Sequence, residues 1–213
     1  MTIKTNLIVK LGFNSRKSIF LSISLISIVM LLISCNEKKY DPVPELKELS
    51  EQDYINRGEY LVNIIGCQDC HSPKRMGERG PEAIEELMFS GYPSERVLPE
   101  ISTDALQKGW IQMNDDFTAF VGPWGVSFAS NLTSDDTGIG SWKLDQFKIA
   151  LRKGKFKGLE NGRDLLPPMP WQNFANLTDE DLKAVFYYLK NTKPVKNVVP
   201  APIPPSDLTG KRP

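Results

Sequence analysis

Two cysteines and the single histidine of the chain lie together in the segment Cys67-Gln68-Asp69-Cys70-His71. This is the C-x-x-C-H pattern, the attachment sequence of a c-type haem. Each thiol can add to one vinyl group of a porphyrin, and the imidazole that directly follows the second thiol can reach the iron. The pattern therefore predicts one covalent haem c, attached to Cys67 and Cys70, with His71 as an axial ligand.

Three other interpretations of this segment are open. A zinc site needs four N, S or O ligands, and these three residues exhaust the thiols and imidazoles available after residue 35. A redox-active C-x-x-C would follow a strand in a thioredoxin-like βαβ pattern, but the residues before Cys67 have helical spacing. The third interpretation is a chance match in a purely structural segment.

The second axial position needs a different residue type, because there is no other histidine. Methionine is the natural candidate, and the segment Leu166-Pro167-Pro168-Met169-Pro170-Trp171 places Met169 between prolines, which should hold its loop extended and pre-ordered. Met113 is the competitor. Met88 falls on an expected helix face and suits the core, and Met76 is too close to His71 to reach the opposite side of a haem.

The beginning of the chain has the features of a secretory signal. Residues 1–34 contain four basic residues and no acidic one, and an apolar stretch ends in Leu32-Ile33-Ser34-Cys35, which resembles a bacterial lipobox. In lipoproteins of that type the cysteine is acylated and becomes the mature N-terminus, so lipid chains on Cys35 would tether the protein to a membrane without spanning it. A plain signal peptide or an uncut anchor helix is the alternative. Asn36, rather than Asp, favours the outer membrane.

The chain has 213 residues with equal numbers of basic and acidic side chains. It has no basic excess, and this argues against a nucleic-acid binder. Three cysteines, one for lipid and two for haem, leave none for a disulfide framework. We expect a signal peptide at 1–34, a flexible tether at 35–49, one haem domain at 50–197 and a proline-rich tail at 198–213.

Hydrophobic periodicity and capping residues predict mostly helices. The expected helices span 50–65, 81–91, 103–108 and 142–153, and a last one begins at Thr178. A short β-hairpin is expected within 117–130. Because helices lie at both ends of the domain, the sequence predicts a small all-α protein.

Several segments together resemble class I cytochrome c domains, and most closely those of the cytochrome subunits of membrane-bound bacterial alcohol and sugar-acid dehydrogenases. These segments are Gly58-Glu59-Tyr60-Leu61, Cys67-x-x-Cys70-His71, Asn131-Leu132-Thr133, Thr137-Gly138-Ile139-Gly140-x-Trp142, Arg152-x-Gly154, Met169-Pro170 and Leu177-Thr178-Asp179-Glu180-Asp181-Leu182. The resemblance implies an all-α class I cytochrome c fold with terminal helices that cross near the haem. It implies His71 and Met169 as axial ligands. The stretch between residues 72 and 130 is longer than a minimal cytochrome c needs and is expected to be an enlarged loop with the short hairpin.

These features predict an electron carrier rather than an enzyme, because His/Met ligation leaves no open coordination site and favours ferrous iron. The expected location is the periplasmic side of a bacterial membrane, and the expected partner is a redox protein such as a dehydrogenase, an oxidase or another cytochrome. The alternative is a haem peroxidase or gas-binding sensor with an open sixth site. A basic cluster, Arg152, Lys153, Lys155 and Lys157, could bind an acidic partner or could simply be cations favoured at a helix C-terminus.

Overall fold

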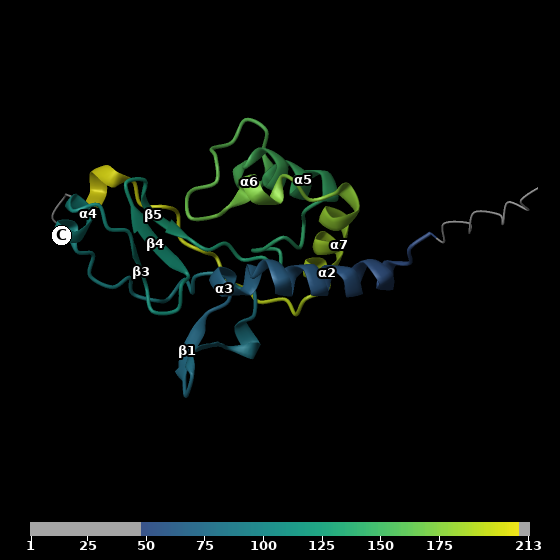
Figure 1. Cartoon of the computed structure of the whole chain (residues 1–213), viewed down its shortest axis with the longest axis horizontal. Helices are drawn as coiled ribbons and strands as arrows, with labels where there is room; N and C mark the ends of the chain where they lie inside the picture. Colours follow the sequence, from purple (N-terminus) through teal and green to yellow (C-terminus); the bar gives the residue numbers. More distant parts are fainter. Residues whose placement is uncertain (1–47, 209–213) are drawn as a thin grey trace, which may run out of the picture. The chain divides into compact units, whose positions relative to one another are not determined.

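A computed structural model of the chain describes residues 48–208 (Figure 1). The predicted signal peptide, Cys35 with its expected lipid, and almost all of the predicted tether lie outside the described residues. Among residues 48–208, no helix combines the length and the apolar character needed to cross a bilayer.

Helix α2 spans Glu51–Ile65 and begins as the sequence predicts. Ser50 is its N-cap, and the Ser50 and Asp53 side chains form a capping box, which satisfies backbone N–H groups that have no partner within the helix. Gly66 ends the helix in the left-handed conformation, with φ at 78°. The residues that α2 buries, Tyr54, Gly58, Leu61 and Val62, have helical spacing.

Helix α7 spans Asp179–Lys190 and packs against α2. Thr178 caps it by accepting a hydrogen bond from the Asp181 backbone N–H, and three acidic residues occupy its first turn. The two helices approach each other closely at Gly58, where an added Cβ would lie 2.0 Å from the Ala184 carbonyl oxygen. This pair forms the centre of the hydrophobic core, together with Phe89, Ile139 and Phe147.

The remaining helices are short. Helix α5 spans Leu144–Lys153, two residues shorter at its start than predicted, because Lys143 and not Ser141 is the N-cap. The others are α3 (Cys67–His71), α4 (Thr103–Gln107) and α6 (Trp171–Phe174), with 3₁₀ turns η1 (Glu85–Leu87), η2 (Phe156–Gly158) and η3 (Pro205–Leu208). In Figure 1 the α5–α6 pair and the hairpin that contains β1 project from opposite sides of α2.

Two small antiparallel sheets complete the fold. Strands β1 (Lys74–Gly77) and β2 (Gly80–Ala83) form a hairpin. Strands β3 (Gln112–Met113), β4 (Ala119–Gly122) and β5 (Gly125–Phe128) form a three-stranded sheet in that order. The β4–β5 hairpin is the one that the sequence predicts, and its inward-facing residues include Val121 and Val126.

The prediction of an all-α, class I cytochrome c fold is wrong, because the described residues contain helices and two sheets in a mixed architecture. The predicted helix at 81–91 accounts for part of the error. Pro81 lies in β2 opposite Met76, and only the single turn η1 follows. The Ile84 N–H donates to the Pro73 carbonyl and the Phe89 N–H to the Ser72 hydroxyl, so tertiary hydrogen bonds hold this segment out of a helix.

The beginning of the predicted proline-rich tail pairs with the sheet. Ile203 forms an antiparallel bridge with Val126 on β5, with N–H···O distances of 2.8 and 3.1 Å in the two directions. Gly125 permits this approach, because an added Cβ would lie 2.0 Å from the Ile203 carbonyl oxygen.

Candidate functional site

The five residues of the C-x-x-C-H motif make up helix α3, which follows α2 directly. Gly66, in the left-handed conformation, is both the C-cap of α2 and the N-cap of α3, so this single residue separates the two helices. Cys67 and Cys70 are half-buried and free of disulfide bonds. The motif is thus preceded by a helix and not by the strand that a thioredoxin-like site requires.

Neither thiol is activated by its surroundings. Burial raises the pKa of Cys67 to about 11, and burial also raises the pKa of Cys70. A redox-active cysteine needs a lowered pKa, because the thiolate is the nucleophile. The electrostatics of α3 therefore argue against a thiol–disulfide enzyme.

His71 is buried, with 9% of its surface exposed, and its ring has a defined orientation. The Nδ1 atom lies 2.7 Å from the Ser130 carbonyl oxygen. Because a carbonyl can only accept, Nδ1 carries the proton and Nε2 keeps a free lone pair. Burial lowers the pKa of the imidazole, which keeps the ring neutral as a metal ligand must be.

Lys74 fixes the end of α3 to the neighbouring loop. Its Nζ donates to the carbonyl oxygens of Asp69 and Ser72, at 2.6 and 2.8 Å, and to that of Asp116 at 3.0 Å. The Asp116 side chain is itself buried and pairs with Arg96 at 2.5 Å. One ammonium group therefore ties the motif to the segment between β3 and β4.

Met169 lies on the loop before α6, and the structure positions that loop from two sides. The Met169 N–H donates to the Leu166 carbonyl at 3.3 Å, so the loop turns here and is not extended as predicted. The Ser127 hydroxyl donates to the Pro167 carbonyl at 2.5 Å. On the other side, the Trp171 ring packs against Gly154, the C-cap of α5.

The other methionines differ in exposure. Met113 is 61% exposed on the edge strand β3, and Met76 is 73% exposed on β1. Met88 packs against the hydrophobic core, as its predicted role requires. The half-buried Met169 is thus the better ligand candidate than Met113. Cys67, Cys70 and His71 are adjacent on α3, whereas Met169 comes from a separate loop, and its ligation stays a prediction.

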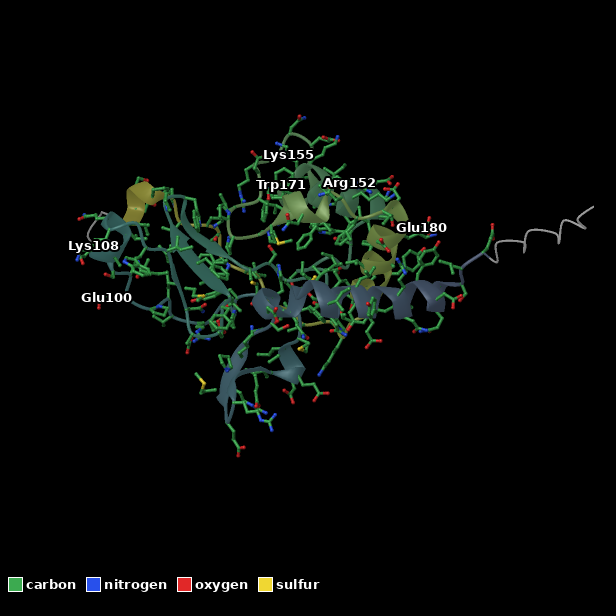
Figure 2. The ribbon with its side chains drawn as sticks, in the orientation of Figure 1. Glu100, Lys108, Arg152, Lys155, Trp171 and Glu180 are labelled. Atoms are coloured by element: carbon green, nitrogen blue, oxygen red, sulfur yellow. The ribbon has the colours of Figure 1, made fainter. Side chains whose placement is uncertain are left out.

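The predicted basic cluster is largely neutralised. Figure 2 shows Arg152 and Lys155 beside Trp171, in the region of α5 and α6. Arg152 pairs with Asp179 at 2.7 Å, Lys153 with Glu160 at 2.6 Å and Lys155 with Asp164 at 2.7 Å. These ion pairs favour a role in packing α5 against its neighbours over a docking surface for an acidic partner.

Within residues 48–208, no group of three or more His, Cys, Asp and Glu side chains is arranged to hold a metal ion. The zinc interpretation of the motif needs such a group. The donor set on α3 fits a c-type haem instead, because two free thiols one helical turn apart are followed by an imidazole with an available Nε2.

Sequence reasoning did not identify Lys74, Ser127 or Ser130 as parts of this site. Ser130 and Pro167 accept hydrogen bonds through their backbone carbonyls. Every residue has such a carbonyl, so the residue type does not predict this role. Lys74 stands three residues after His71, and this short spacing was the only available clue.

Comparison with curated proteins gives several relatives of one kind. The chain is 38% identical over 148 residues to the cytochrome c subunit of a quinone alcohol dehydrogenase from Gluconobacter oxydans. It is 31% identical over 143 residues to the gluconate 2-dehydrogenase cytochrome c subunit of Pantoea cypripedii. It is 28% identical over 190 residues to the fructose dehydrogenase cytochrome subunit of Gluconobacter japonicus. The chain is a homologue of dehydrogenase cytochrome c subunits.

These matches cover 68%, 66% and 88% of this chain. They cover only 23%, 24% and 30% of the three relatives, so this chain spans less than a third of the length of each. No protein-family model matches it. The predicted resemblance to these subunits is confirmed.

Proposed function

We propose that this chain carries one covalent haem c on helix α3 and transfers electrons. The observation that supports this most directly is the arrangement of two free thiols and a buried imidazole, whose Nδ1–H is bound to the Ser130 carbonyl. The homology to cytochrome c subunits gives independent support.

Different residues of the chain would attach the haem, bind its iron and orient the axial imidazole. The thiols of Cys67 and Cys70 would attach the porphyrin through two thioether bonds, and His71 Nε2 would bind the iron. Bound haem supplies one-electron redox chemistry. The Ser130 carbonyl orients the His71 ring and increases its basicity through the Nδ1–H bond.

Met169 is proposed as the second axial ligand. Met169 is half-buried, and its loop is held by Ser127 on one side and by α5 on the other. A thioether ligand raises the reduction potential, and two protein ligands leave no position for a substrate. The chain is therefore proposed to be an electron carrier rather than an enzyme.

The proposed location and partner follow from the N-terminus and from the relatives. Acylation of Cys35 would anchor the protein on the periplasmic side of a bacterial membrane, in the outer membrane. The relatives are subunits of dehydrogenases, so the proposed electron donor or acceptor is a redox protein of the dehydrogenase or oxidase kind.

Optical spectra before and after carbon monoxide test this function. The full chain is produced in a cell with haem-attachment machinery, and the oxidised and reduced spectra are recorded. We expect a low-spin spectrum that carbon monoxide does not change. A high-spin spectrum that carbon monoxide shifts would indicate an open site and would contradict the electron-carrier function in favour of a peroxidase or gas sensor.

A further inference from the structure

Two chain segments hold His71, one by its backbone and one by its ring. The Gly91 N–H donates to the His71 carbonyl at 2.8 Å, and the His71 Nδ1–H donates to the Ser130 carbonyl at 2.7 Å. The two segments also bind each other, because the Tyr92 N–H donates to the Ala129 carbonyl at 3.0 Å. The position of the His71 ring therefore depends on how firmly these segments are fixed.

Asn197, far away in the sequence, fixes the first segment. Its side chain is 8% exposed, and its amide nitrogen donates to the carbonyls of Ser90 and Tyr92, at 2.7 and 2.9 Å. Its amide oxygen accepts from the Ser94 N–H at 3.0 Å. The two donor contacts lie on either side of Gly91, the residue that binds the His71 carbonyl.

The stretch that carries Asn197 is also bound to the second segment. Asn131 follows Ser130 directly, is 4% exposed and donates to the Val195 carbonyl at 2.8 Å. The Thr137 hydroxyl accepts from both Asn131 Nδ2 and the Asn197 N–H, at 3.1 and 3.0 Å. Residues 195–197 thus connect the two segments that hold His71.

We propose that Asn197 is a positioning residue for the axial histidine. It holds Ser90–Tyr92 against Ala129–Ser130, and this keeps the Ser130 carbonyl in line with the His71 Nδ1–H. The role rests on the proposed haem function. A firm Nδ1–H bond makes the imidazole more basic and favours ferric iron, so loss of the Asn197 contacts should favour ferrous iron and raise the reduction potential.

Two substitutions and a matched control test this role in the full haem-bearing chain. Asn197→Ala removes all three side-chain hydrogen bonds, and Asn197→Asp removes only the two donated ones. Asn191→Ala is the control, because Asn191 also donates a side-chain amide hydrogen to a backbone carbonyl, that of Tyr187 at 2.8 Å, but this contact lies at the C-cap of α7. The midpoint potential and the thermal midpoint are measured for each variant.

Both Asn197 variants are expected to shift the redox equilibrium at least about threefold towards the ferrous form, which is about 28 mV at 59 mV per tenfold change. The Asn191 variant is expected to keep the potential of the unaltered protein. If the Asn197 variants lose thermal stability while their potentials stay unchanged, Asn197 only stabilises the fold and the proposal is overturned.

Hydrogen exchange on the unaltered protein covers the case in which the Asn197 variants do not fold. The Gly91 and Tyr92 amides are expected to exchange as slowly as the Val62 amide in the core of α2. Exchange about a hundredfold faster would mean that the segment opens by itself, and this result also overturns the proposal. An unaltered protein without covalent haem would instead contradict the proposed function. The exchange result would still decide whether the segment next to His71 is fixed, as the role of Asn197 requires.

Discussion

The Ser127 hydroxyl donates to the Pro167 carbonyl at 2.5 Å and so joins the three-stranded sheet to the loop that carries Met169. Ser127 is buried, and the Trp124 indole N–H donates to its hydroxyl at 3.2 Å. Ser130, three residues later, binds the His71 ring. The long segment between α3 and α5 therefore contacts both the His71 side and the Met169 loop of the proposed haem site.

Replacement of Met169 should open the sixth coordination position. Met169→Ala is expected to abolish the weak ferric methionine–sulfur charge-transfer band and to make the reduced protein bind carbon monoxide. Met113→Ala is the control, and because Met113 is mostly exposed on β3, it should leave the spectrum unchanged. A band that survives in Met169→Ala and disappears in Met113→Ala would show that Met113 is the ligand.

Lys74 is half-buried and should stabilise the C-x-x-C-H motif by more than an exposed lysine would. Lys74→Met leaves three carbonyl oxygens without their donor and is expected to cost about 1–3 kcal/mol of unfolding free energy. Arg75→Met removes the same charge from the next residue, which is exposed, and should change stability by less than about 0.5 kcal/mol. Denaturant unfolding of the two variants measures the difference, and equal losses would refute the role of the carbonyl contacts.

Gly58 should tolerate no side chain, because the backbone of α7 lies very close to it. In Gly58→Ala the new Cβ would lie 2.0 Å from the Ala184 carbonyl oxygen, so the helices must separate. Overpacking of this kind costs about 1–3 kcal/mol, and the thermal midpoint should fall accordingly. Glu59→Ala, on the exposed face of the same helix, is the control with an expected change of less than about 0.5 kcal/mol. If both variants unfold at the same temperature, the close packing of the two helices is not as described.

Asp179 should make part of the stability depend on pH. Hydrogen bonds from Lys148 and Arg152 lower the pKa of Asp179 below its usual value. Because the folded pKa is lower than the unfolded value of about 3.9, this stabilisation is present above that pH and disappears as the pH falls through the folded pKa. Asp179→Asn should therefore lower the thermal midpoint at pH 7 and have little effect near pH 2.

The control for this prediction is Asp145→Asn, which changes an exposed carboxylate in the first turn of α5. It tests whether any acidic residue near a helix N-terminus has the same effect. Two results would contradict the contribution of the Lys148–Asp179–Arg152 ion pairs. One is a difference in thermal midpoint between the unaltered protein and Asp179→Asn that persists at pH 2. The other is an equal loss of thermal midpoint in Asp145→Asn.

The helices predicted most accurately are those whose signals are local. Helices α2 and α7 have a capping residue, an acidic first turn and an apolar stripe, and they begin where these signals indicate. The β4–β5 hairpin was predicted from the Gly122-Pro123-Trp124-Gly125 turn between two apolar runs. In each case the deciding interactions lie within a few residues of one another.

The errors concern segments that distant contacts control. The stretch 81–91 has helical periodicity, but hydrogen bonds to Ser72 and Pro73 hold it in other conformations. The expectation of an all-α fold failed for a different reason. Strands β1, β2 and β3 pair with neighbouring segments, but they are short and lack the alternation of apolar and polar residues that would have predicted them. The proposed haem-binding residues stand together in a sequence motif, whereas Ser130 and Asn197 make contacts that join remote parts of the chain.

The number of covalent haems per chain tests the central claim most directly. The full chain is produced with haem-attachment machinery, denatured, separated from unbound haem, and measured by mass and by haem absorbance. The account predicts one haem per polypeptide, retained in Cys35→Ser and lost when Cys67 and Cys70 are both replaced by Ser. An unaltered chain that carries no haem after denaturation, or a double variant that still carries one, would contradict it.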